Sequence, residues 1–165
     1  MCTEGDVRLS RKNADWLGQE ANRLEQEANK FAAELLLPAA TLSTIVRERE
    51  LSLRTCKSVS KLFRTSLTVA AIRCVEVSER KAAFIESKNG VVSSFAKSRS
   101  WIGHINWGGE IGSGALARQL SIGNDMEKKG RVPAMEWIWG EIGTLMEESM
   151  LMPSYKSVLS LLIFD

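Results

Sequence analysis

A glutamate facing the apolar side of a predicted helix is the first residue of this chain that could do chemistry. At about 100° per residue, one arc of an amphipathic helix holds Leu17, Ala21, Leu24, Ala28, Phe31, Ala32 and Leu35. Pro38 ends that helix near Leu37. Glu25 points into the arc, and a bare buried carboxylate costs several kcal/mol. Glu25 must therefore be paired, protonated or bound to a metal.

Asn29 lies one turn after Glu25 and on the same side of this helix. One class of zinc peptidase uses a Glu with an amide four residues later as its third metal ligand and the group that orients it. The spacing equally allows a Glu that reaches solvent at the helix edge or pairs with an arginine. Both interpretations stay open from spacing alone.

The stretch from Glu25 to Pro38 resembles the second signature of the ImmA/IrrE family of zinc metallo-endopeptidases. The family signature usually reads ExEANxFAAELLMP, and the run here is Glu25-x-Glu27-Ala28-Asn29-x-Phe31-Ala32-Ala33-Glu34-Leu35-Leu36-x-Pro38. A weaker likeness continues through residues 66–73, 147–149 and 159–162. In the family an earlier HExxH helix supplies two zinc ligands and the general base, and the first Glu of the second signature completes the site. The resemblance thus implies zinc as cofactor, Glu25 as third ligand with Asn29 beside it, and a repressor-type transcription factor as substrate or partner.

The sequence departs from that family in its histidines. The only histidine of the 165 residues is His104, which follows the signature, and no HExxH is present. Two of the three zinc ligands and the general base are missing, so we assign no catalytic residue and expect no stably bound zinc. We expect a homologue truncated at its N-terminus and inactive as given. A zinc enzyme assembled in trans, with the HExxH helix on another polypeptide, is the remaining enzymatic hypothesis.

A non-catalytic regulatory module that binds DNA or a repressor is the alternative. We predict helices over residues 40–49 and 53–63, and a third that begins after an N-cap at Ser66, a helix-turn-helix-like plan. Residues 46–81 hold nine Lys or Arg against four Glu, a balance of 9 − 4 = +5, which could meet phosphates. In the third helix only Thr68 and Arg73 could read bases. Packing beneath the rest of the fold is the competing interpretation of these helices.

The second half of the sequence changes to strand patterns. Asn89-Gly90 between two apolar runs predicts a β-hairpin over residues 82–97. Residues 101–114 form a glycine-rich loop that matches a nucleotide-binding loop poorly. We predict a polar turn region marked by Asn124-Asp125 and Lys128-Lys129-Gly130, and strands at 134–139, 145–152 and 158–164. Within 134–139, Trp137 and Trp139 should share one face, either packed against the helices, which is the favoured interpretation, or exposed as a binding surface.

The predicted fold class is α+β, with a helical part at residues 1–81 and a β-rich part at 82–165. Hydrophobic residues at 44% and charged residues at 25% are ordinary for a soluble globular protein, and the net charge of +2 names no partner. Three cysteines without a CxxC pair favour a reducing cytoplasm. No apolar run approaches the ~18 residues of a membrane span, so we expect no membrane partner. His104 alone is a weak metal or acid/base candidate, and we expect a surface or hydrogen-bonded histidine.

Overall fold

The computed structural model describes residues 27–28 and 31–164. Glu25 and Asn29, the two residues that the resemblance places at a metal, lie outside the described residues. The chain divides into two compact units, Met1–Pro38 and Ala39–Asp165. The described part of the first unit is helical over 27–28 and 31–36, and the amide of Leu37 donates to the carbonyl of Ala33 at 2.8 Å. The helix therefore ends before Pro38, as predicted.

Three helices open the second unit: α2 (Ala39–Glu48), α3 (Leu53–Phe63) and α4 (Leu67–Val77). Each of the last two begins at a serine whose hydroxyl accepts an amide hydrogen bond, from Thr55 to Ser52 at 3.1 Å and from Val69 to Ser66 at 3.2 Å. Between α3 and α4 the backbone of Arg64 adopts the left-handed conformation, with φ at 52°. The three predicted helices and the Ser66 cap are confirmed. These helices belong to the same compact unit as the strands that follow.

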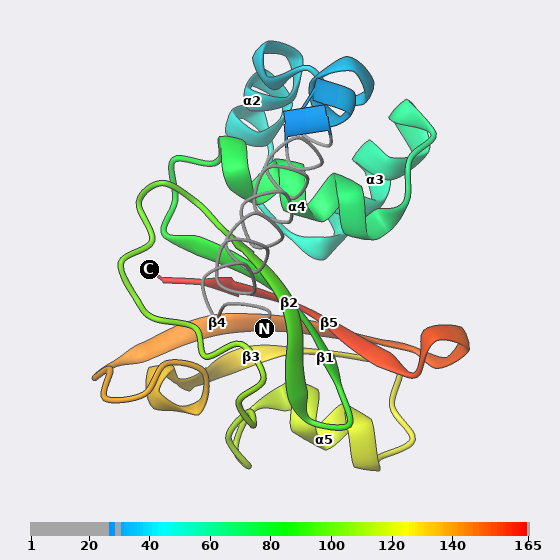
Figure 1. The fold of residues 1–165 in the computed structure, drawn as a ribbon. Helices are drawn as coiled ribbons and strands as arrows, with labels where there is room; N and C mark the ends of the chain where they lie inside the picture. Colours follow the sequence, from blue (N-terminus) through cyan, green and yellow to red (C-terminus); the bar gives the residue numbers. More distant parts are fainter. Residues whose placement is uncertain (1–26, 29–30, 165) are drawn as a thin grey trace, which may run out of the picture. The chain divides into compact units, whose positions relative to one another are not determined.

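The strands form one five-stranded antiparallel sheet in the order β2-β1-β5-β4-β3 (Figure 1). Their bounds are β1 (Ala82–Lys88), β2 (Val91–Lys97), β3 (Glu127–Pro133), β4 (Thr144–Met152) and β5 (Ser157–Ile163). The predicted hairpin is confirmed, since β1 pairs with β2 across Asn89 (φ 53°) and Gly90 (φ 76°). The central strand β5 is buried along its whole length. The α+β class is confirmed.

Helices cover both faces of this sheet, with α2, α3 and α4 on one side and α5 (Leu116–Ile122) on the other (Figure 1). A hydrophobic cluster on the α5 side joins the sheet, α5 and the two loops over 98–115 and 134–143, and includes Trp101, Leu120, Trp137 and Leu162. None of the helices within residues 31–164 is long and apolar enough to cross a membrane.

One strand prediction and part of one turn prediction are wrong. Residues 134–139 contain the short 3₁₀ helix η1 (Ala134–Glu136) and a turn instead of a strand, so Trp137 is buried while Trp139 is 98% exposed. The alternation that would place both tryptophans on one face holds only in extended backbone. Of the predicted polar turn region, Asn124 and Asp125 lie between α5 and β3, but Lys128–Gly130 is part of β3, an edge strand on which Lys129 pairs with Glu148 of β4. Lysines are common on edge strands because they discourage pairing with other chains.

Candidate binding site

The described residues do not bring together donors for a zinc ion. His104 is exposed on the loop after Trp101. Within residues 27–28 and 31–164 no group of three or more His, Cys, Asp or Glu side chains could hold a metal ion. These donors do not fit the zinc centre that the resemblance implies, so we derive no catalytic step through zinc.

The predicted base readers lie on α4, which is largely covered. Ala70, Ala71, Cys74 and Val75 are buried, and α4 packs against α2, α3, β1 and β2. Thr68 is half-buried; the side chain of Arg73 is 13% exposed and its guanidinium pairs with Glu76 at 3.0 Å. Only Val69 and Glu76 of α4 are exposed. A helix that reads DNA presents several polar side chains to the groove, and α4 does not.

The cations of the basic segment gather on α3 instead. Arg54, Lys57 and Lys61 follow the spacing i, i+3, i+7, which places them along one side of the helix. Arg54 and Lys61 are exposed, as is Arg64 just beyond the helix, and within the described residues none of the three has an ion pair. We call Arg54, Lys57, Lys61 and Arg64 the α3 basic face.

A groove of 380 Å³ continues the α3 basic face toward β3 and β4. Four cations and two carboxylates line this α3–β3 groove, a balance of 4 − 2 = +2: Arg54, Lys57, Lys128, Lys129, Glu127 and Glu148. Lys129 pairs with Glu148 at 2.7 Å, and this hydrogen bond raises the pKa of the lysine above its usual value. The lysine is therefore firmly cationic at neutral pH, and the groove keeps an excess of positive charge.

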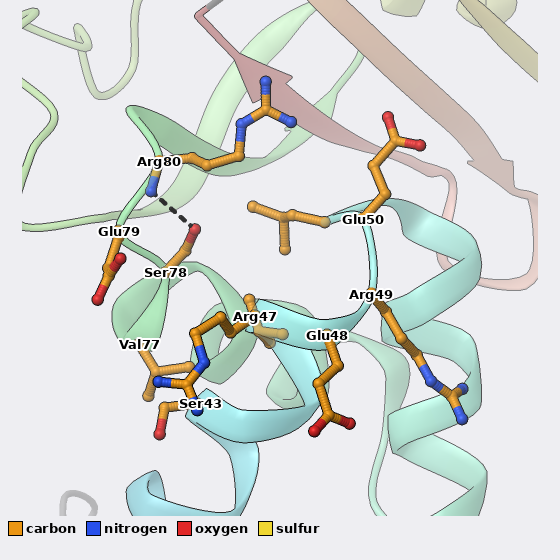
Figure 2. A pocket seen from close by; sticks show the side chains of 11 residues that line it. Ser43, Arg47, Glu48, Arg49, Glu50, Val77, Ser78, Glu79 and Arg80 are labelled. Atoms are coloured by element: carbon orange, nitrogen blue, oxygen red, sulfur yellow. Dashed lines mark hydrogen bonds between the residues drawn. The ribbon is translucent and has the colours of Figure 1, made fainter.

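A second pocket, of 430 Å³, lies where the ends of α2 and α4 face each other. Figure 2 shows Arg47, Glu48 and Arg49 from the end of α2 across from Glu79 and Arg80 after α4. Its lining holds three arginines and three glutamates, so their formal charges cancel, and it adds an apolar part from Val46, Leu51 and Val77. Such a lining suits a ligand with both signs of charge, for example a peptide segment.

Adjacent glutamates on β4 position the helices on the two faces of the sheet. Because neighbouring strand residues point to opposite faces, Glu147 and Glu148 face different helices. The carboxylate of Glu148 accepts the amide hydrogen of Leu53, the first residue of α3, at 2.8 Å. The carboxylate of Glu147 accepts those of Leu116 and Ala117 at the start of α5, at 3.0 and 2.7 Å. Glu148 thus fixes the end of α3 that borders the groove.

Sequence reasoning did not assign these roles to Glu147 and Glu148. The available signal was the polar stretch Glu147-Glu148-Ser149 inside the otherwise apolar run of residues 145–152. A carboxylate buried in a strand must accept hydrogen bonds, but the sequence does not say which donors reach it.

A scan against protein-family models and a search of characterised proteins both gave no match for this sequence. Neither comparison tests the resemblance of residues 25–38 to the ImmA/IrrE signature, which stays a prediction from the sequence.

Proposed function

We propose that this chain is a homologue of the ImmA/IrrE zinc metallo-endopeptidases that works by binding and does not hydrolyse peptides by itself. The observation that supports the homology is the signature run from Glu25 to Pro38, including Glu25 and Asn29 at their family positions. The lack of catalysis follows from the single histidine and the missing HExxH. No residue of this sequence matches the glutamate that takes the proton from zinc-bound water in the family.

An unfolded protein substrate tests this proposal in the presence of added zinc. We expect no cleavage of reduced casein above the rate without protein. Cleavage that needs zinc and disappears in Glu25→Gln would contradict the proposal. Cleavage that appears only after a separate HExxH polypeptide is added would instead support assembly in trans.

A regulatory role through the basic segment 46–81 is the second candidate, and the α3 basic face favours it. Three of its cations have no ion pair within residues 31–164, and the adjoining groove carries a net positive charge. We propose that this surface contacts the phosphate backbone of DNA with little base reading, because α4 exposes only Val69 and Glu76. The repressor-type factor implied by the family resemblance is the other partner, and the mixed-charge pocket of Figure 2 would suit one of its peptide segments.

The salt dependence of binding distinguishes DNA from a repressor-type protein as the partner. If the three unpaired cations meet phosphates, raising the salt from about 50 to 200 mM should weaken binding of a short duplex about 40-fold. Arg54→Glu with Lys61→Glu should abolish the binding, whereas the α4 control Thr68→Val should leave it unchanged. If Thr68→Val weakens duplex binding as much as the double variant does, or if no duplex binds even at low salt, DNA is excluded as the partner. The repressor-type factor is then the remaining candidate.

We also propose a reducing cytoplasmic location. The thiols of Cys56 and Cys74 are both buried and free, as expected where thiols stay reduced.

A further inference from the structure

Large apolar side chains protrude from two loops on the side of the sheet away from α3. Ile102 on one loop is 84% exposed, and Met135, Trp139 and Ile142 on the other are 67%, 98% and 92% exposed. We call these four residues the loop face. Isolated exposed apolar residues are ordinary, but several that gather on one surface mark an interaction site.

The two loops are packed against each other. A Cβ added to Gly103 would lie 2.8 Å from the side chain of Ile138, so these two residues are in close contact. The amides of Gly112 and Gly114 donate to the backbone carbonyl and the carboxylate of Glu136, both at 2.8 Å. Ile102 and Trp139 each lie one residue from the Gly103–Ile138 contact. The loop segments that carry Ile102 and Trp139 are therefore joined at this contact.

The base beneath the loop face is fixed by hydrogen bonds. The amide of Ala134 donates to the carbonyl of Gly143 at 2.9 Å and closes the loop. The amide of Ile138 donates to the carbonyl of Ala134 at 2.9 Å. The indole of Trp137 donates to the buried carboxylate of Glu147 at 2.8 Å. Because these inward groups are held, the exposed side chains need little further ordering when a partner binds.

The charge around the loop face indicates the chemistry of that partner. The loops over 98–115 and 134–143 hold three glutamates, Glu110, Glu136 and Glu141, against one cation, Arg99, a balance of 1 − 3 = −2. The chain as a whole carries a net charge of +2, so this acidic character is local. Exposed apolar side chains on loops with a net negative charge are complementary to an apolar segment that carries basic residues.

We propose that the loop face is a docking surface for a basic amphipathic segment of a partner protein. It lies on the face of the sheet that α5 covers, since the inward residues of both loops share the hydrophobic cluster of α5. The α3 basic face is on the opposite side, where Glu148 holds the start of α3. The two surfaces can therefore be occupied at the same time, and this proposal does not depend on the proposed function.

A pair of designed peptides tests the docking surface on the full chain. One is an amphipathic peptide of leucine and lysine with a fluorescent label, and the other has glutamate at each lysine position. We expect saturable binding of the lysine peptide, at least tenfold weaker binding in Trp139→Ser/Ile142→Ser, and no binding of the glutamate peptide. Glu141→Lys should also weaken binding of the lysine peptide. The matched control is Tyr155→Ser, which removes an aromatic side chain that is 69% exposed on another turn and should change nothing.

Three results would overturn the proposal. Equal binding of the lysine peptide to the wild type and to Trp139→Ser/Ile142→Ser would show that the loop face is not the contact. A dimer in sedimentation equilibrium that this double variant dissolves would show that a second copy covers the face. Binding to phosphatidylcholine vesicles that the same variant abolishes would assign the face to a lipid surface.

Discussion

The buried carboxylate of Glu147 should contribute more to stability than any other polar side chain that we describe. It is fully buried and accepts four hydrogen bonds, from the amides of Leu116 and Ala117, the indole of Trp137 and the hydroxyl of Ser149, at 2.7–3.0 Å. A buried donor that loses its acceptor costs about 1–3 kcal/mol. Three of these four donors are N–H groups that cannot act as acceptors.

The substitution Glu147→Gln leaves one N–H without an acceptor in its best orientation. The new amino group can replace the oxygen that faces Ala117 and Ser149, because the Ser149 hydroxyl can turn to accept from it and donate to Ser160, 2.7 Å away. The amide of Ala117 then has no acceptor, which predicts a loss of about 1–3 kcal/mol. Glu147→Met removes the acceptor from all three N–H groups and should cost about 3–9 kcal/mol, a large part of a typical stability of about 5–15 kcal/mol.

Glu148→Gln is the matched control. Its amide oxygen can keep the hydrogen bond from Leu53, and Lys129 is exposed enough to turn to water. We expect a loss of about 0–1 kcal/mol. Urea unfolding, monitored by tryptophan fluorescence and circular dichroism, gives the free energy of unfolding of all three variants. If Glu147→Gln and Glu147→Met each lower the free energy of unfolding by no more than Glu148→Gln does, the buried N–H groups do not depend on the Glu147 carboxylate as their acceptor.

Three further predictions concern the helical layer. Ser66→Ala removes the acceptor of the Val69 amide and should cost about 1 kcal/mol in urea unfolding, with no comparable loss in Ser58→Ala inside α3. Arg64→Gly should stabilise the protein by about 1 kcal/mol because glycine adopts the left-handed conformation without steric cost, and a melting temperature no higher than that of Arg64→Ala would refute this. A hydrogen bond with Cys74, together with burial, raises the pKa of Cys56, so the folded thiol stays neutral while the unfolded one ionises above about pH 8.5. The free energy of unfolding should therefore fall as the pH rises above that value, and the fall should be smaller in Cys56→Ala.

Local signals in the sequence were sufficient for α2, α3, α4 and the β1–β2 hairpin, but not for α5. Ser66 predicts the start of α4 because its side chain can accept the amide hydrogen of Val69, a contact within one turn of chain. Asn89-Gly90 predicts the β1–β2 turn because both residues tolerate positive φ. Each of these signals needs only neighbouring residues to act.

The wrong predictions concern segments whose structure depends on distant partners. Lys128–Gly130 has the composition of a turn but forms an edge strand because β4 pairs with it. Trp137 and Trp139 alternate as in a strand, but the indole of Trp137 donates to Glu147, ten residues later, while Trp139 lies on a turn next to Gly140. No local pattern carries such information.

The candidate sites were predictable only in part. The sequence placed an excess of cations in residues 46–81 but assigned base reading to Thr68 and Arg73 of α4, which the fold largely covers. The cations that remain available lie on α3, and the groove beside them includes β3, about seventy residues later in the chain. The proposed metal ligand Glu25 and its neighbour Asn29 lie outside the described residues and stay predictions.

A zinc titration of the full chain is the decisive experiment for the proposal that this chain binds partners without zinc chemistry. Equilibrium dialysis with metal analysis gives the zinc bound per chain at micromolar free zinc and neutral pH. We expect no stoichiometric zinc and no difference in bound zinc between the wild type and Glu25→Gln. One zinc per chain at sub-micromolar affinity, lost in Glu25→Gln, would contradict the proposal.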